Sequence, residues 1–328
     1  MSDATVPSDE IAVYREGISQ VLSEVGKVIV GQEKMVERLL VALLLDAHIL
    51  LEGVPGLAKT TAVKALAKVV SAKFSRVQFT PDLLPSDIVG TQIYNPRDAQ
   101  FSVKHGPVFC NILLADEINR APAKVQSALL EAMQERQVTI GEATFALPSP
   151  FTVLATQNPI EQEGTYPLPE AQMDRFLFKI LLDYPSADDE LEIIRRIAAP
   201  HEAQLQPLLG PSQIMELRRF IRTIHVDSRI DRYIVSLVHA TRRPKESGLS
   251  TVASFIQLGA SPRASINLHL AGQAIAFLRG RAYVTPQDIK EIAPDVMRHR
   301  ILLTYEAEAE GKTADDLLRV ILDHVEVP

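Results

Sequence analysis

The sequence predicts an α/β protein, with a five-stranded parallel sheet, two β-hairpin insertions and a smaller helical domain in its second half. Short apolar runs alternate with helical periodicity through the first half of the chain, as expected for buried parallel strands joined by helices. After Tyr184-Pro185 the strand signals stop and helical patterns follow. We therefore expect an α/β domain over residues 1–184, of which 1–10 form a flexible tail, and a helical domain over 185–328.

Five apolar runs are expected to form the sheet. The first, 48–52, ends at a glycine-rich turn, and a helix follows it because apolar residues recur there at helical spacing, at Val63, Leu66, Ala67 and Val70. The other runs are 76–80, 111–115, 151–156 and 176–182. A second helix is expected between the third and fourth runs, with a buried face of Val125, Ala128, Leu129, Ala132 and Met133.

Two segments depart from this alternation and predict hairpins. Residues 138–140 and 143–145 flank Gly141-Glu142, whose leading glycine fits a type II′ turn. Residues 92–94 and 101–103 flank a looser loop and predict a second hairpin. In the helical domain, capping residues mark three helix starts, at Ser186, Thr285 and Thr313.

The composition excludes several classes of function. The 328 residues include 34 basic and 41 acidic side chains, a net charge of -7, which excludes the broad positive field of a non-specific nucleic-acid binder but leaves room for a local basic groove. The single cysteine, Cys110, cannot form an internal disulfide, and no histidine or cysteine pair has the spacing of a zinc site. No apolar run approaches the roughly 20 residues of a membrane-spanning helix. We expect a cytoplasmic protein.

A glycine-rich segment between the first strand and its helix predicts a phosphate-binding loop. Glycines let successive N–H groups turn toward an anion, and the helix start adds its positive dipole end. Lys59 would reach the β- and γ-phosphates, and Thr60 could ligate Mg²⁺. The common pattern has glycine where this chain has Ala58, a change that we expect to be tolerated because alanine can enter a helix. The expected nucleotide-binding residues of this segment are Gly53, Val54, Pro55, Gly56, Leu57, Ala58, Lys59, Thr60 and Thr61.

Polar residues also follow later strands, at the edge where open α/β sheets bind ligands. Asp116 could hold the metal and Glu117 could polarise the attacking water, although alone this pair could also cap the next helix. Asn158 could hold the water or the γ-phosphate, although Asn-Pro is also a common turn. Arg263 lies in the first turn of a helix, where a cation opposes the helix dipole unless an anion is near. A solvated or surface-paired arginine is the alternative there.

Together these motifs resemble the MoxR family of AAA+ ATPases. The similarity runs from about Val30 to residues 305–309 and includes the segments 116–122 and 168–176 and the triplet 261–263. The resemblance implies an AAA+ P-loop NTPase core with a helical lid domain, which binds ATP with Mg²⁺ and hydrolyses the ATP. The two hairpins would be the family's insertions, which face the pore or a partner in related machines.

The resemblance also implies roles for individual residues. The glycine-rich segment becomes the Walker A loop, Asp116 with Glu117 the Walker B pair, and Val30 with Gly31 the segment that contacts adenine. The gating residue on the second strand is not identified, and Gln78 is a candidate. The residues to which the resemblance assigns catalysis are Lys59, Glu117, Asn158 as sensor 1, Arg263 as sensor 2, and Arg175 as an arginine finger that completes the site of a neighbouring subunit.

An arginine finger implies a ring of identical subunits, usually a hexamer. The function implied is chaperone-like remodelling or activation of a protein partner or a metal-enzyme complex, often together with a protein that carries a von Willebrand factor type A domain. A nucleic-acid motor remains a second hypothesis, against which the acidic charge and the 5% aromatic content count. An ATPase subunit like that of magnesium chelatase and a non-hydrolysing nucleotide-dependent scaffold are two further hypotheses. The sequence does not identify the client.

Overall fold

The computed structural model describes residues 8–97, 99–159, 164–198 and 203–328. By its internal contacts the chain divides into two compact units. The first, the α/β unit, comprises residues 19–176 and 180–216. The second, the helical unit, comprises the described residues before 19, together with 177–179 and 217–328.

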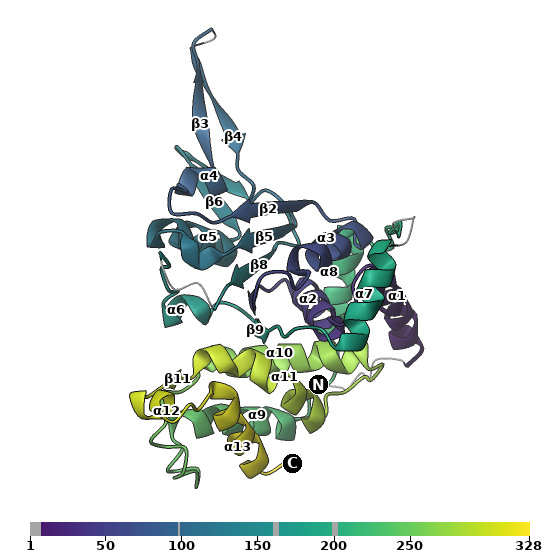
Figure 1. Cartoon of the computed structure of the whole chain (residues 1–328). Coiled ribbons are helices and arrows are strands. Elements are labelled where there is room, and N and C mark those ends of the chain that lie inside the picture. The colour runs from purple at the N-terminus through teal and green to yellow at the C-terminus, as the bar shows by residue number, and fades with distance from the viewer. Residues whose placement is uncertain (1–7, 98, 160–163, 199–202) are drawn as a thin grey trace. The chain divides into compact units, whose positions relative to one another are not determined.

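The α/β unit contains the predicted five-stranded parallel sheet (Figure 1). Its strands lie in the order β2-β5-β8-β1-β9, so the chain crosses over rather than pairing neighbours in sequence. Register places Gln78 opposite Asp116 on adjacent parallel strands. Each strand lies within two residues of its predicted position: β1 Ile49–Glu52, β2 Phe74–Gln78, β5 Ile112–Asp116, β8 Thr152–Gln157 and β9 Phe178–Leu181.

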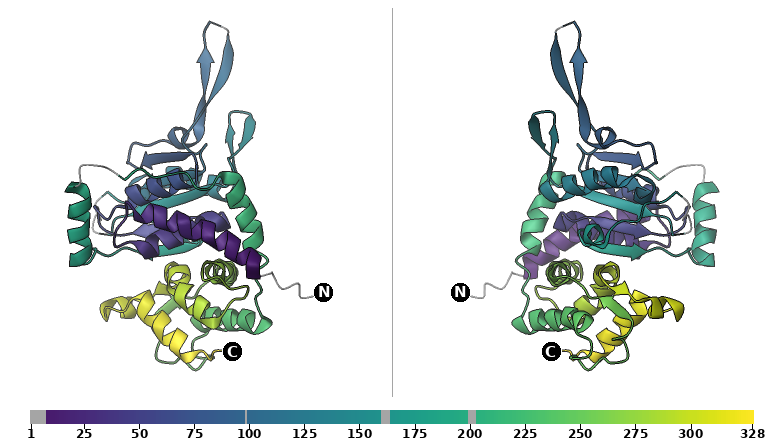
Figure 2. Two further views of the ribbon diagram at one scale, coloured as in Figure 1. Left: turned by 90° about the vertical axis from the view of Figure 1, so that its right-hand side faces the viewer. Right: turned by 90° about the vertical axis from the view of Figure 1, so that its left-hand side faces the viewer.

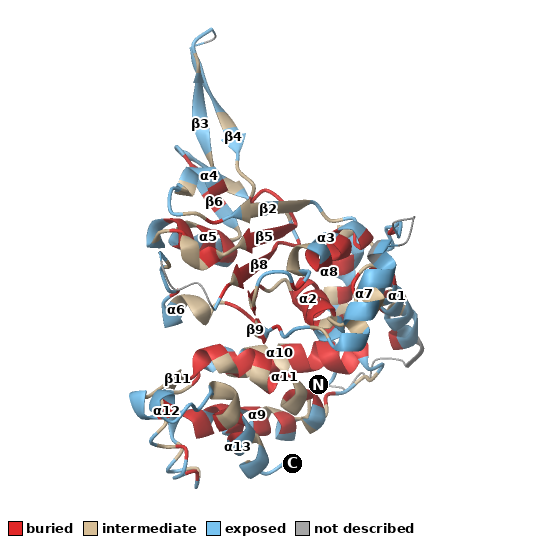
Figure 3. Cartoon of the chain, viewed as in Figure 1, coloured by how far each residue is buried: buried red, intermediate tan, exposed pale blue. Residues whose placement is uncertain are grey.

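The central strands are buried on both faces, which explains why they show no polar alternation. All residues of β5 before Asp116 are buried, and so are those of β8 before Gln157 (Figure 3). Alternate residues of these strands, Leu113 and Val153 among them, form one core with the buried face of α5. The helices of this unit are α2 Glu33–Leu45, α3 Lys59–Val69, α4 Pro85–Val89, α5 Ala123–Glu135, α6 Glu170–Met173 and α7 Ala187–Ala198, with a short 3₁₀ turn η1 at Ile118–Arg120.

Both predicted hairpins are present and project from the α/β unit (Figure 2). The longer pairs β3 (Gly90–Asn95) with β4 (Gln100–His105), and the shorter pairs β6 (Gln137–Ile140) with β7 (Ala143–Ala146). Gly141 has a φ of +64°, as the first position of the predicted turn requires. The longer hairpin is exposed along most of its length (Figure 3).

The boundary between the two units lies later in the chain than residue 184, where the sequence predicted it. Residues 180–216 group with the α/β unit, and hydrogen bonds tie this segment to it. Arg196 on α7 donates to the carbonyls of Gly26 and Lys27, and the backbone N–H of Gln206 donates to the Glu24 carboxylate. Helix α8, Pro211–Ile221, spans the boundary.

The last residues of the expected N-terminal tail are helical. Helix α1 runs from Ser8 to Gly26, so Ser8–Glu10 are helical. Residues 1–7 lie outside the described residues.

The helical unit starts its helices with the capping residues that the sequence indicated. Thr285 and Thr313 each form a capping box with an aspartate three residues later, and the Ser186–Asp189 pair forms the same contacts before α7 in the other unit. Its elements are α9 Ser228–Arg242, α10 Pro262–Leu278, α11 Pro286–Met297, α12 Tyr305–Ala309 and α13 Ala314–His324, the 3₁₀ turn η2 Arg298–Arg300, and the short strands β10 Ile256–Leu258 and β11 Leu302–Leu303.

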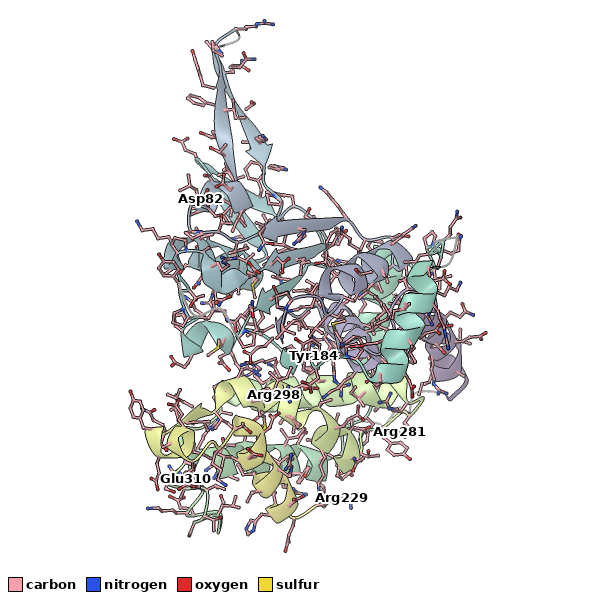
Figure 4. The ribbon with its side chains drawn as sticks, in the orientation of Figure 1. Asp82, Tyr184, Arg229, Arg281, Arg298 and Glu310 are labelled. Atoms are coloured by element: carbon pink, nitrogen blue, oxygen red, sulfur yellow. The ribbon has the colours of Figure 1, made fainter. Side chains whose placement is uncertain are left out.

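Buried ion pairs hold the helical unit together. Arg281 donates to both carboxylate oxygens of Asp288, and Arg298 contacts Asp295, which is fully buried, and Asp315 (Figure 4 labels both arginines). Removal of one partner from such a pair strongly destabilises the fold, because a buried charge is left without its counter-ion. Among the described residues, no helix combines the length and the apolar character needed to cross a membrane.

Candidate functional site

A cavity of about 440 Å³ lies within the α/β unit, at the carboxyl edge of the sheet. Its walls come from the turn after β1, from the start of α3 and from the ends of β2, β5 and β8. The lining residues are Gly53, Pro55, Gly56, Leu57, Ala58, Lys59, Thr60, Thr61, Arg76, Gln78, Asp116, Glu117, Thr156, Gln157 and Asn158. The fold therefore brings the predicted phosphate loop together with the polar residues that follow two other strands.

The loop after β1 has the backbone conformation of an anion-binding turn. Gly56 has a φ of +90° and Ala58 a φ of +54°, and α3 begins immediately after Ala58. No side chain caps this helix start and no acidic residue occupies its first turn, so its first N–H groups have no side-chain partner and the positive end of the helix dipole lies at the cavity. This arrangement fits the phosphates of a nucleotide.

The reason expected for the tolerance of Ala58 was wrong. Alanine was expected to enter the helix, but Ala58 is the residue before it and adopts a left-handed conformation. That conformation costs an L-residue about 1–2 kcal/mol, which glycine at this position would avoid. The loop geometry is nevertheless maintained.

Gly53 is required by close packing rather than by an unusual φ. A Cβ at this position would lie 2.9 Å from Cβ of Leu182 and 3.0 Å from its carbonyl oxygen. The backbone at Gly53 therefore passes directly against the end of β9, and no larger residue fits without displacing one of the two segments.

Lys59 points back across the loop. Its Nζ donates a hydrogen bond of 2.5 Å to the carbonyl oxygen of Gly53. Burial lowers the pKa of the Lys59 ammonium, while Asp116, Glu117 and Glu52 act in the opposite direction. The ammonium is thus held in the cavity, partly desolvated and close to the carboxylates of Asp116 and Glu117, where an anion would find a cation with few competing waters.

Asp116, at the end of β5, has both carboxylate oxygens engaged. Oδ1 accepts a hydrogen bond of 2.6 Å from the hydroxyl of Thr156 on β8. Oδ2 accepts two from the guanidinium of Arg76 on β2, at 3.1 Å from Nε and 2.6 Å from Nη2. Strands on either side of β5 therefore orient this carboxylate.

Glu117 is the next residue and has a left-handed backbone, with a φ of +55°. Its N–H donates to the hydroxyl of Thr156 at 2.8 Å. Its Oε2 accepts from the amide of Gln78 at 2.7 Å and from Arg120 at 3.0 Å. A non-glycine residue in this region is found where surrounding contacts over-determine it, often at functional sites.

The remaining predicted residues fall into three groups. Asn158 lines the cavity and is buried. Four predicted residues belong to the same unit but do not line the cavity: Val30, Gly31, Val54 and Arg175. Gly31 packs against Asp189, where an added Cβ would lie 2.9 Å from the carboxylate. Arg175 donates a hydrogen bond of 3.0 Å to the carbonyl of Leu130 on α5. Arg263 belongs to the helical unit, at the start of α10 after the capping residue Ser261.

Three lining residues were not predicted: Arg76, Thr156 and Gln157. Arg76 and Gln78 are two residues apart on a strand and therefore share a face, which is a signal that the sequence contains. Their target is not visible in the sequence, because it depends on the pairing of β2 with β5. Thr156 lies at the end of an apolar run and was expected only as a strand residue.

The donor set fits Mg²⁺ bound with a nucleotide. The Thr60 hydroxyl and the Asp116 carboxylate both line the cavity, and Mg²⁺ prefers oxygen ligands, usually one or two from protein with phosphate and water for the rest. Within the part of the chain that the structure describes, no group of three histidine, cysteine or acidic side chains could hold a metal ion. Magnesium here would therefore depend on the phosphates.

The comparisons with known proteins agree with this site. Residues 48–178 match the ATPase family associated with various cellular activities (AAA), and residues 249–321 match the AAA lid domain. Chaperone MoxR1 of Mycobacterium tuberculosis is 51% identical over 321 residues, which cover 98% of this chain and 85% of that protein. The chain belongs to the MoxR family of AAA+ ATPases.

Two further similarities cover nearly all of this chain. Protein MoxR of Methylorubrum extorquens is 30% identical over 336 residues, with 96% of each chain covered. A solved structure of a Cytophaga hutchinsonii protein has 53% identity and a TM-score of 0.92, and covers 98% of this chain and 97% of that one. The predictions of the family and of the AAA+ core with a helical lid are confirmed.

Proposed function

We propose that this MoxR-family protein hydrolyses ATP with Mg²⁺ in the cavity beside the Walker A loop, and uses the reaction for chaperone-like remodelling or activation of a protein partner. The observation that carries the proposal is the convergence of the uncapped α3 start, Lys59, the Asp116–Glu117 pair and Asn158 on one cavity. Loop, cation, metal ligand and base are the parts that phosphoryl transfer to water requires.

Each part has a role that follows from its chemistry. The N–H groups at the start of α3 and the Lys59 ammonium bind and orient the phosphates. Thr60 and Asp116 would hold the metal, which, when bound, neutralises charge that develops on the phosphoryl oxygens. Glu117 accepts the proton of the attacking water, and Asn158 orients that water or the γ-phosphate.

In related ATPases an arginine finger supplies a further cation that stabilises the transition state. Arg175 does not line this cavity. We assign it to the cavity of a neighbouring copy, so the active form is a ring, and a hexamer is the expected size. Arg263 would contact the phosphates from the lid, and Val30 with Gly31 would contact the base. A cytoplasmic location is part of the same proposal.

The chaperone role is supported by the 51% identity to Chaperone MoxR1. That identity extends over nearly the whole chain, so it favours a protein client over the nucleic-acid motor or chelatase subunit that the sequence left open. A protein with a von Willebrand factor type A domain is the expected partner in this activity.

Nucleotide binding and phosphate release by the purified full chain test the proposal. We expect ATP turnover by the natural protein and loss of ATP binding in Lys59→Ala, because the partly buried cation is removed from the loop. Lys68→Ala is the matched control, since Lys68 is an exposed lysine of the same helix that does not line the cavity. Equal ATP affinity in Lys59→Ala and Lys68→Ala would contradict the assignment of the site.

A client can be sought with a variant that binds ATP without completing hydrolysis. Glu117→Gln keeps the shape of the side chain but cannot accept a proton. Incubated with ATP and then recovered from cell extract, this variant should retain proteins that the natural protein releases. Recovery of the same set of proteins with Lys59→Ala would show that the retained proteins do not depend on ATP.

A further inference from the structure

A guanidinium occupies the position on Asp116 where a metal ion is expected. Arg76 extends from β2 and donates two hydrogen bonds to Oδ2 of Asp116, and the shorter is 2.6 Å. The side chain of Arg76 is 45% exposed, whereas that of Asp116 is 17% exposed. The carboxylate is therefore fixed in the wall of the cavity, while the cation reaches it from the solvent side.

The second oxygen of Asp116 is not an equivalent alternative for the metal. Oδ1 accepts from Thr156, which is buried, at 2.6 Å, and that same hydroxyl accepts the N–H of Glu117. Thr156 thus uses both its donor and its acceptor to fix the turn between β5 and η1. Oδ1 is held by a buried hydroxyl, whereas Oδ2 is held by an arginine whose side chain is 45% exposed, so Oδ2 is the oxygen whose partner can move away into solvent.

We propose that Arg76 is a cationic placeholder, which competes with the magnesium ion of the bound nucleotide for Oδ2 of Asp116. The inference rests on the proposed function, because it presumes a metal–nucleotide complex in this cavity. Direct coordination of Mg²⁺ by Oδ2 would take up a lone pair that Arg76 now uses and would bring two cations onto one oxygen, so it favours the departure of Arg76. The ion pair therefore reduces the contribution of magnesium to nucleotide affinity.

The departure of Arg76 would also change the hydrogen bonds around Glu117. Nη2 of Arg76 donates to Oε1 of Gln78 at 3.1 Å, and Nε2 of Gln78 donates to Oε2 of Glu117 at 2.7 Å. Gln78 is oriented by the cation on one side and by the carboxylate on the other. If Arg76 moved away from Asp116, Gln78 would lose one of the two hydrogen bonds that orient its amide, and its contact with Glu117 would be less constrained. Metal binding at Asp116 is thereby linked to the base.

A purely structural role for this ion pair makes a different prediction. A half-exposed pair contributes little to stability and is screened by salt, and its loss would affect nucleotide binding equally with and without magnesium. A placeholder instead changes the ratio of the two affinities. That ratio is the quantity to measure.

The experiment uses a fluorescent ADP, methylanthraniloyl-ADP, with the full-length protein. Its dissociation constant is measured once in EDTA and once with excess Mg²⁺, for the natural protein, Arg76→Gln and Arg76→Lys. Because ADP is not hydrolysed, the readout is independent of turnover. Lys68→Gln, which removes one positive charge from the exposed side of α3, is the control for general electrostatics.

We expect the gain in affinity from Mg²⁺ to be about two- to fivefold larger in Arg76→Gln than in the natural protein, the size set by a partly exposed ion pair. The gain in affinity from Mg²⁺ should rise less in Arg76→Lys, because an ammonium keeps the charge but not the two hydrogen bonds that the guanidinium donates to Asp116. An unchanged or smaller gain in Arg76→Gln, or the same increase in Lys68→Gln, would overturn the inference. If the natural protein bound no ADP under either condition, the proposed function itself would fail.

Discussion

The hydroxyl of Thr156 on β8 donates a hydrogen bond of 2.6 Å to Oδ1 of Asp116 at the end of β5. The same hydroxyl oxygen accepts the N–H of Glu117 at 2.8 Å. One buried hydroxyl thus fixes the orientation of the predicted metal ligand and the backbone of the predicted base. Asn158 follows two residues later, immediately after β8, so one segment positions both the turn after β5 and the predicted sensor residue.

Replacement of this hydroxyl tests its orienting role. Thr156→Val removes donor and acceptor at nearly constant volume, and leaves the Glu117 N–H without its partner. We expect ATP turnover to fall about 10- to 100-fold, as for other residues that orient a metal ligand, and the free energy of unfolding to fall by about 1–3 kcal/mol. Phosphate release and urea unfolding measure the two effects. Thr156→Ser, which keeps the hydroxyl, should recover most of the turnover.

Glu117→Gln should separate binding from hydrolysis. The amide retains the size of the carboxylate but cannot take the proton of the attacking water, so the turnover number should fall by about 100-fold or more. ATP affinity, measured by calorimetry with Mg²⁺, should remain within a few-fold of the natural protein. Normal turnover in this variant would exclude Glu117 as the base.

Arg175→Ala should bind ATP and fail to hydrolyse it, because Arg175 would act on the site of another copy. The expected loss of turnover is about 1,000-fold, the usual contribution of an arginine finger. Mixing this variant with Lys59→Ala supplies the decisive measurement. The first has intact cavities and the second has intact fingers, so mixed rings should regain part of the activity that neither has alone.

No recovery on mixing, together with normal ATP binding by Arg175→Ala, would contradict action between copies. Because Arg175 also donates to the carbonyl of Leu130, the thermal stability of the variant must be compared with that of the natural protein. Arg175→Lys is the companion variant, since it keeps the charge.

His48 makes stability depend on pH. Burial lowers its pKa from 6.5 to about 3, while its Nδ1 accepts the N–H of Val153 and its Nε2 donates to the carbonyl of Met133. Between these two pH values the unfolded chain binds a proton that the folded chain does not. His48 therefore has no effect on stability above about pH 6.5. Below that pH it lowers the free energy of unfolding, and it lowers it further as the pH falls toward 3.

The predicted loss of unfolding free energy from this residue is about 2 kcal/mol between pH 7 and pH 5. Urea unfolding at the two pH values measures it, and His48→Gln should show a smaller difference between them because glutamine does not titrate. An identical pH dependence in both proteins would show that folding does not lower the pKa of His48.

The local patterns of the sequence predicted much of the fold. The five strands, both hairpins and the capping boxes at Thr285 and Thr313 all appear within two residues of their expected positions. These features depend on neighbours in the chain, through alternation, turn geometry or a side chain that caps its own helix. The prediction that Ala58 enters the helix was wrong, because a left-handed residue before a helix leaves no periodic pattern in the sequence.

The sequence by itself determined the nucleotide loop, the carboxylate pair and the family, because each is a contiguous motif whose residue types carry the chemistry. Only the tertiary structure decided which side chains hold those carboxylates. Arg76, Gln78 and Thr156 reach Asp116 and Glu117 because β5 lies between β2 and β8, and the order of strands in a sheet is set by the packing of the whole core rather than by any local pattern.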